Sequence, residues 1–162
     1  MDTMLQFLQK RSMKAADKLN AEIRDISQAE AFRFSCADWP DHKWGAGQNG
    51  SIAGIVIHLA SWKQRLLPLA LGSTAVTNYD VSVEKDLNQS DWQSIQKWFG
   101  KISSEWNQAL INLSESEMDS IKYWEGGETL LSKIVINIID HDIQHSSQIE
   151  YLKQRILWES KS

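Results

Sequence analysis

Apolar residues recur every three or four positions through four long segments of the chain, which predicts amphipathic α-helices. The first predicted helix covers residues 4–26, and Thr3 with Gln6 forms a capping-box pattern at its start. One face of this helix is apolar: Leu5, Leu8, Ala15, Ala16, Leu19, Ile23 and Ile26. The opposite face is charged, so the pattern indicates a helix with one buried side.

The second predicted helix, residues 51–67, is apolar around most of its circumference, as expected of a helix that packs on several sides. Asn49 or Ser51 is the expected cap. Pro68 is expected to kink or end the helix, because proline lacks the amide donor and clashes with the preceding turn. The polar connection over residues 70–89 is too long for a tight antiparallel turn and favours a crossover.

The third predicted helix starts at Ser90, which forms a second capping-box pattern with Gln93. Gly100 costs this helix about 1 kcal/mol relative to alanine, and the well-spaced apolar residues can offset that cost. These are Trp92, Ile95, Phe99, Ile102, Trp106, Leu110 and Leu113. Residues 114–127 are expected to form a loop, and a fourth helix is expected over residues 129–158.

The composition is that of one helical domain spanning residues 1–162. Hydrophobic residues make up 42% of the 162 residues, which is an ordinary fraction for a globular protein. Proline occurs only twice, so long helices are allowed almost everywhere. Tryptophan occurs eight times, which indicates aromatic-rich layers and makes a homodimer plausible. The expected fold is therefore all-α, a four-helix bundle with long loops after helices one, two and three.

Several partners are excluded by charge and hydropathy. The net charge is −4, and no basic block is present, so nucleic acid is not an expected partner. No segment reaches the roughly 18 apolar residues that span a bilayer, and the amino-terminal segment is an amphipathic helix rather than a signal peptide. A single cysteine, Cys36, fits a reducing compartment, so a cytoplasmic location is expected.

The loop expected over residues 32–50 concentrates proline, glycine and asparagine. Trp39 and Trp44 in this loop are expected to cover the end of the bundle or to form a contact surface. His42 is most simply a solvent-exposed histidine, and Cys36 is a structural or incidental thiol. Residues 27–30 are expected to form one short capped turn before this loop.

His141 and His145 are four residues apart in the fourth predicted helix, so both imidazoles lie on one face. That face is otherwise apolar: Ile134, Ile138, Ile149, Leu152 and Ile156. Two histidines in a core can simply be hydrogen-bonded residues, but burying both requires partners for four ring nitrogens. A metal ion would bind two of those nitrogens, and helical zinc sites use this spacing.

His58 lies in the second predicted helix on the side that also carries Ile55, Trp62 and Leu66. By itself it could be a structural histidine bonded to a carbonyl oxygen. Together with His141 and His145, however, it makes three of the four histidines face the interior of the bundle. Three neutral nitrogen ligands leave a coordination position open, as in catalytic rather than structural metal sites.

Two stretches, SIAGIVIHLASW around His58 and HDIQHSSQI from His141 to Ile149, resemble the signatures of the DinB/YfiT-like superfamily. The resemblance extends over essentially the whole chain in length, helix order and the long second connection. It implies a four-helix bundle with up-down-down-up connections. It also implies His58, His141 and His145 as ligands of a divalent metal such as nickel or zinc. Gln148 matches a glutamine of the family, whereas Ser147 stands where many members have glycine.

The resemblance further implies a metal-dependent enzyme that transfers a low-molecular-weight thiol to electrophilic small molecules in detoxification. A bound divalent ion lowers the pKa of a thiol or of water. Metal-dependent hydrolysis is therefore the alternative reaction. A third interpretation, from a different class, is a non-enzymatic dimeric bundle with a vestigial metal site.

No general base can be identified from the sequence. Asp140 and Asp142 flank His141 but point away from its face, so they are expected to be solvated or to contact other helices. Gln148 either bonds an imidazole or the substrate, or is an ordinary interface amide. Three aromatic residues could wall a pocket or belong to the core: Trp62, Tyr123 and Trp124.

Overall fold

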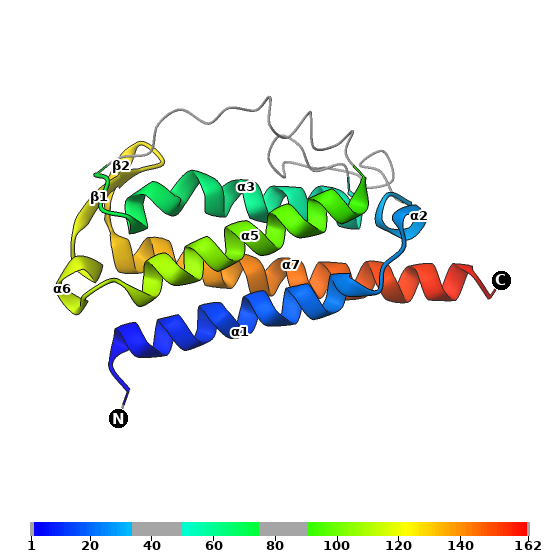
Figure 1. Ribbon diagram of the computed structural model, residues 1–162, viewed down its shortest axis with the longest axis horizontal. Coiled ribbons are helices and arrows are strands. Elements are labelled where there is room, and N and C mark those ends of the chain that lie inside the picture. The colour runs from blue at the N-terminus through cyan, green and yellow to red at the C-terminus, as the bar shows by residue number, and fades with distance from the viewer. Residues whose placement is uncertain (1, 34–49, 75–90, 162) are drawn as a thin grey trace.

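The computed structural model describes residues 2–33, 50–74 and 91–161. Four long helices lie alongside one another and confirm the predicted all-α four-helix bundle (Figure 1). These helices are α1 (Met4–Arg24), α3 (Ile52–Ala70), α5 (Trp92–Ile111) and α7 (Leu131–Glu159). Shorter elements join them: α2 (Gln28–Ala31), α6 (Glu115–Met118), β1 (Ile121–Trp124) and β2 (Gly127–Leu130).

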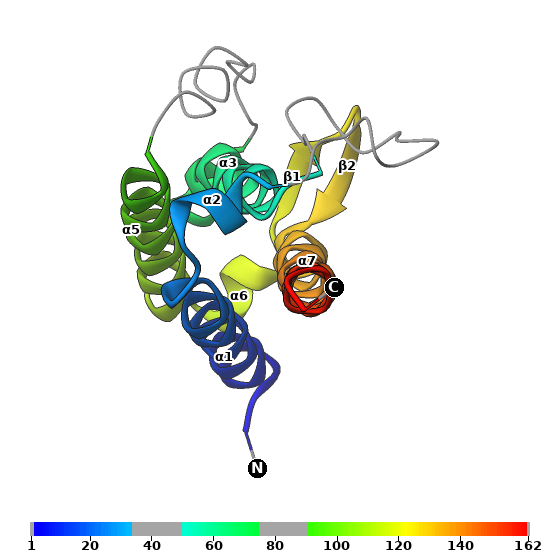
Figure 2. The same ribbon diagram turned by 90° about the vertical axis from the view of Figure 1, so that its right-hand side faces the viewer.

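The helices form a ring in which α1 packs on α5 and α7, and α3 packs on the same two helices (Figure 2). Gln9 near the start of α1 donates to the carbonyl oxygen of Leu110 near the end of α5, at 2.8 Å. At the other end of the pair, Trp92 Nε1 donates to the carbonyl oxygen of Ile26, also at 2.8 Å. Thus α1 and α5 are antiparallel, and Figure 1 shows α7 running with α1, and α3 with α5.

Side-chain caps begin most of the helices. The predicted capping box of Thr3 and Gln6 is present at α1, Ser51 caps α3, and Ser27 caps the short helix α2. The predicted box at α5 is wrong by one residue, because the cap is Asp91, whose carboxylate accepts the Ser94 amide at 2.9 Å. An aspartate caps as well as a serine, and its negative charge also interacts favourably with the helix dipole.

The sequence predicts that Pro68 kinks or ends the second long helix, and the second of these outcomes is wrong. Helix α3 continues through it to Ala70. The proline lies in the last turn, where it removes only one hydrogen bond, and the two residues after it, Leu69 and Ala70, are buried. Packing of these last residues therefore offsets the local cost.

Residues 114–127 are not a loop, and this prediction is also wrong. Helix α6 is followed by an antiparallel hairpin in which Trp124 pairs with Gly127. Its two turn residues, Glu125 and Gly126, both have positive φ, at 52° and 82°, as a tight two-residue hairpin requires. Because residues 127–130 pair in this hairpin, α7 begins at Leu131 rather than at residue 129.

Two hydrogen bonds attach the hairpin to the segment that follows α3. The buried Lys122 donates from Nζ to the carbonyl oxygen of Ser73 at 2.9 Å. The Tyr123 amide donates to the carbonyl oxygen of Thr74 at 2.8 Å. The hairpin is thereby held beside the carboxyl end of α3, and the ring centre of Trp124 lies 6.3 Å from that of Trp62 on α3.

Two apolar clusters fill the bundle, and they confirm the apolar faces predicted from the sequence. One lies around the first half of α3 and the second half of α7, and the other around the opposite halves of these helices. Their largest buried side chains include Trp106, Phe99, Leu19 and Leu66. Between the clusters, the apolar stripe of α7 is interrupted by His141 and His145.

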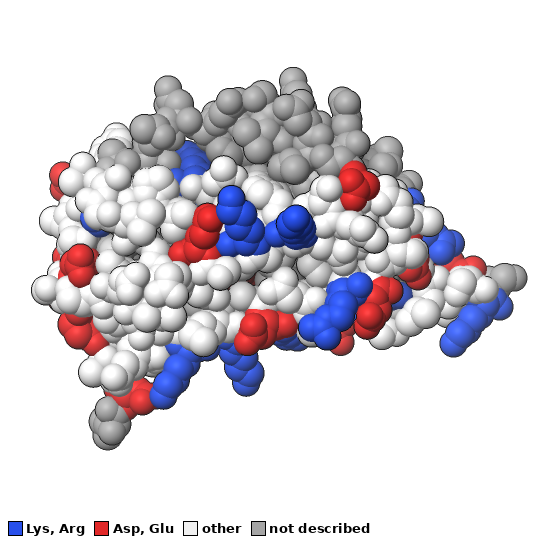
Figure 3. Space-filling model, in the orientation of Figure 1, with Lys and Arg blue, Asp and Glu red and all other residues white. Residues whose placement is uncertain are grey.

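The outer surface carries both signs of charge. On the face shown in Figure 3, lysine and arginine lie beside aspartate and glutamate without separating into one-signed areas. None of the helices in the described ranges has the length and apolar character needed to cross a bilayer. The expected homodimer and cytoplasmic location stay predictions.

The interpretations of Cys36, Trp39, His42 and Trp44 concern residues outside the described ranges, as do most of the two long connections after α2 and α3.

Candidate metal centre

Helices α3 and α7 bring His58, His141 and His145 together in the bundle wall. The Nε2 atom of His141 lies 2.9 Å from Nε2 of His58 and 3.0 Å from Nε2 of His145. One ligand nitrogen from each residue lies within 4.8 Å of the other two. The four-residue spacing on α7 and the inward face of α3 thus produce the three-histidine cluster that the sequence predicts.

The cluster is strongly desolvated. His145 is completely buried, and His58 is only 7% exposed. Burial, together with the neighbouring imidazoles, lowers the pKa of His58 to about 3 and that of His141 to about 2. Burial also lowers the pKa of His145. All three rings are therefore neutral near pH 7, which is the form that binds metal ions.

Gln148 orients one of these ligands. Its side-chain carbonyl oxygen lies 2.6 Å from Nδ1 of His145 and accepts the proton of that nitrogen. In this tautomer, Nε2 of His145 carries a lone pair, and this nitrogen lies 3.0 Å from Nε2 of His141. Of the two interpretations of Gln148 from the sequence, the structure shows the contact with an imidazole.

The donor set fits a divalent transition-metal ion. Imidazole nitrogens suit zinc, nickel, copper and iron, and bind zinc at about 2.0–2.1 Å. The separations of 2.9 and 3.0 Å from Nε2 of His141 are short enough for one ion to contact both nitrogens of each pair.

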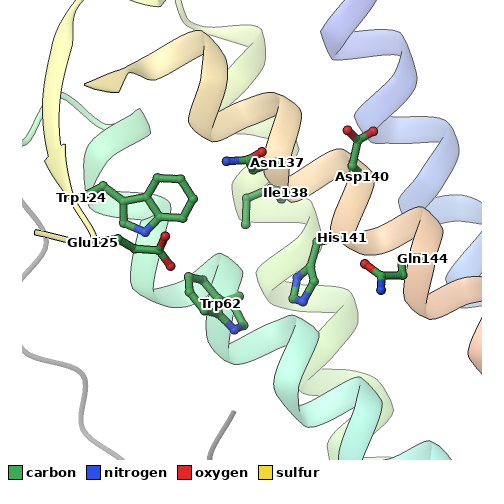
Figure 4. Close-up of a pocket in the computed structure, with 8 residues that line it drawn as sticks. All are labelled: Trp62, Trp124, Glu125, Asn137, Ile138, Asp140, His141 and Gln144. Atoms are coloured by element: carbon green, nitrogen blue, oxygen red, sulfur yellow. The ribbon is translucent and has the colours of Figure 1, made fainter. Parts of the chain in front are cut away.

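A cavity of about 300 Å³ opens beside the cluster (Figure 4). His141 forms part of its wall, so one of the three candidate ligands faces the cavity directly. The other lining residues are Trp62, Trp124, Glu125, Asn137, Ile138, Asp140 and Gln144. Of the aromatic residues considered from the sequence, Trp62 and Trp124 line the cavity, whereas Tyr123 is 54% exposed and does not.

A buried ion pair lies next to the cluster. Lys63 on α3 bonds to Asp142 on α7, and each side chain is only 1% exposed. The ammonium group of Lys63 also lies 5.3 Å from the centre of the Phe99 ring on α5. The pair therefore connects three helices within a few residues of His58, His141 and His145.

The two aspartates that flank His141 have different environments. Asp142 contacts another helix, one of the two roles expected for it, and burial raises the pKa of its carboxyl even though Lys63 opposes this shift. Asp140 is exposed and lines the cavity. In Figure 4 its carboxylate points away from His141, so it is poorly placed as a base for a group bound there.

Sequence reasoning missed two functional candidates, Lys63 in the buried ion pair and Glu125 in the lining of the cavity. Lys63 is a cation in a helix that is apolar around most of its circumference, and this was the available signal for a buried pair. The run Ile121–Trp124 is rich in β-branched and aromatic residues and is followed by a glutamate and two glycines, which is a hairpin signal.

Removing the contact at Nδ1 of His145 should weaken metal binding without unfolding the bundle. For Gln148→Leu we expect the affinity for zinc to fall 10- to 100-fold, the usual effect of losing the group that orients a histidine ligand. Competition with a chromogenic chelator measures the change. Gln154→Leu, at an exposed position of the same helix, is the control and should bind zinc normally. Equal affinities for both variants would contradict the role of Gln148.

Acidification should destabilise the metal-free protein. The pKa values of His58 and His141 are lowered to about 3 and about 2, against about 6.5 in the unfolded chain, so below pH 6.5 the unfolded state binds more protons. Each histidine then removes about 1.4 kcal/mol from the unfolding free energy per pH unit between pH 6 and pH 4. Urea titrations at several pH values measure the slope, and His58→Leu should lessen it. A flat profile in this range would contradict the burial of neutral rings.

Comparison with known proteins agrees with the four-helix fold. Residues 4–149 match the family model described as the DinB superfamily. A solved structure of YfiT from Bacillus subtilis, described as a probable metal-dependent hydrolase with an unusual four-helix bundle topology, is similar in fold, with a TM-score of 0.64. The two are 16% identical, and the similarity covers 96% of this chain and 90% of YfiT. No curated protein matches the sequence significantly. Because the family match spans most of the chain, this protein belongs to the DinB superfamily.

Proposed function

We propose that this protein is a divalent-metal-dependent enzyme that transfers a low-molecular-weight thiol to an electrophilic small molecule. The observation that carries the proposal is the convergence of three neutral imidazoles at the wall of a 300 Å³ cavity. His58, His141 and His145 would hold the ion, nickel or zinc. When bound, the ion lowers the pKa of a thiol or a water molecule, so that a nucleophile is available at neutral pH.

The residues around the cluster have separate tasks in this proposal. Gln148 holds His145 in the ligating tautomer. Trp62, whose ring centre lies 5.9 Å from that of His141, shields the histidine side of the cavity from water. The amides of Asn137 and Gln144 line the same cavity and offer donors and acceptors that orient an electrophile.

The position of the carboxylates favours a thiol over water as the nucleophile. Hydrolysis is helped by a base close to the attacking water, in addition to the lowering of the water pKa that a bound metal supplies. Among the described residues that line the cavity, the carboxylate of Asp140 points away from His141, and Glu125 lies on the far side of Trp62 (Figure 4). A thiol that has lost its proton is already a strong nucleophile and does not need a base at the moment of attack.

Metal-dependent hydrolysis is the second candidate. It is supported by the similarity in fold to YfiT, which is described as a probable metal-dependent hydrolase. In that reaction the same three histidines and the same cavity would serve, and Asp140 would have to turn toward His141 to act as the base.

The two reactions can be separated with one protein preparation. Metal-loaded protein is incubated with a panel of low-molecular-weight thiols and a haloaromatic acceptor, and in parallel with ester and amide substrates. We expect thiol conjugation that His58→Ala abolishes. Cleavage of esters or amides that is lost in His58→Ala, without any conjugation, would replace the transferase by the hydrolase.

A further inference from the structure

The cavity beside His141 has a second end, formed by the hairpin. The ring centre of Trp62 lies 5.9 Å from that of His141 and 6.3 Å from that of Trp124. Trp62 therefore stands between the histidine end and a hairpin end, where Trp124 is followed directly by Glu125 (Figure 4). A molecule that fills the cavity contacts chemically different groups at its two ends.

The hairpin end has the chemistry of a site for an organic cation. The rings of Trp62 and Trp124 are perpendicular, with an angle of 89° between their planes, so they wall the space on two sides. In Figure 4 the carboxylate of Glu125 lies next to both rings. Indole rings attract cations through their electron-rich faces, and pockets of aromatic residues recognise alkylated ammonium groups in this way.

Charge at the cavity wall points to the same class of ligand. The described lining residues include two carboxylates, Glu125 and Asp140, and neither lysine nor arginine. Trp62 already attracts one cation, because the guanidinium of Arg65 lies 5.2 Å from its ring centre, although Arg65 does not line the cavity. An anionic head group would meet the carboxylates without a compensating cation from these residues.

The geometry points to a substrate that carries an alkylated ammonium group, bound at the hairpin end by Trp62, Trp124 and Glu125. Glu125 is then a specificity-determining residue. A divalent ion held by the histidines repels an ammonium group, so electrostatics directs the cation to the hairpin end and the reactive part of the molecule to His141. The assignment of His141 as the reacting end rests on the proposed function, whereas binding of the cation does not.

The hairpin is held rigidly enough to present this carboxylate. Lys122 and Tyr123, just before Trp124, are hydrogen-bonded to the carbonyl oxygens of Ser73 and Thr74. Glu125 itself occupies a turn position with a φ of 52°, one of the two positions that the tight turn restricts. The turn thus determines the position of the backbone from which the Glu125 side chain extends.

Binding of choline to the metal-free protein tests the inference without any turnover. Isothermal titration calorimetry compares choline with its neutral carbon isostere, in which a tert-butyl group replaces the trimethylammonium group. We expect choline to bind about 10-fold more tightly than the isostere, because the two differ only in charge. Glu125→Gln should weaken choline binding about 5-fold or more and leave the isostere unchanged.

Glu128→Gln is the matched control, because Glu128 is an exposed residue of the same hairpin that does not line the cavity. It should bind choline like the wild type. Equal binding of the two isosteres, no binding of either at the solubility limit, or the same loss in Glu128→Gln would overturn the inference. His145→Ala separates the two proposals, because this variant should lose metal binding and retain choline binding. Metal analysis therefore tests the proposed metal centre, and choline titration tests the cation site.

Discussion

Replacing His145 by alanine is expected to abolish tight binding of a divalent metal. Wild-type protein purified without a histidine tag and without added metal should contain about one divalent ion per chain, and the variant should contain almost none. His145 is the most buried of the three histidines, so alanine leaves a space that water cannot easily fill with an equivalent ligand. The loss of metal affinity should exceed the 10- to 100-fold loss expected when a residue that orients a ligand, such as Gln148, is replaced. Elemental analysis of the purified proteins measures it.

The fourth histidine of the chain provides the control for this experiment. His42 lies in the connection after α2, and it takes no part in the three-histidine arrangement expected from the sequence. His42→Ala should retain the full metal content. A wild-type protein without metal, or His145→Ala with unchanged metal content and affinity, would show that the cluster is not a metal centre.

Breaking the buried ion pair is expected to cause the largest loss of stability among single substitutions near the site. In Asp142→Leu the ammonium group of Lys63 remains buried without its carboxylate, and the Phe99 ring 5.3 Å away compensates only in part. Removing one partner of a buried pair costs about 3–5 kcal/mol. Urea unfolding of the metal-free proteins measures the difference in the free energy of unfolding.

The double variant Lys63→Met with Asp142→Leu tests whether that cost comes from an unpaired charge. Because neither charge remains, the double variant should recover most of the lost stability. A double variant that is as unstable as Asp142→Leu would show that packing, rather than charge, explains the loss. Measuring its zinc affinity also tests whether the pair sets the position of α3 on α7, because His58 must meet His141 and His145 across this contact.

Local sequence patterns determined the helices and the placement of two of the three histidines in the cluster. The apolar periodicity of α7 and the four-residue spacing of His141 and His145 need only the geometry of one helix, so both could be predicted without tertiary information. Helix boundaries were less certain. The cap of α5 is Asp91 rather than Ser90, and a sequence pattern does not separate two neighbouring residues that can both cap a helix. Helix α3 continues past Pro68 because its last residues are buried, and this packing depends on tertiary contacts.

The sequence alone therefore determined a four-helix bundle, the inward faces of its helices and the three histidines that could share one ion. Only the tertiary structure decided what surrounds them. Lys63 and Asp142 lie 79 positions apart, and their pairing depends on how α3 packs on α7. Trp124 and Glu125 reach the cavity because the hairpin is bonded to the end of α3. Helix periodicity is encoded within a few residues, whereas a pocket is made by segments whose contacts follow from packing across the whole bundle.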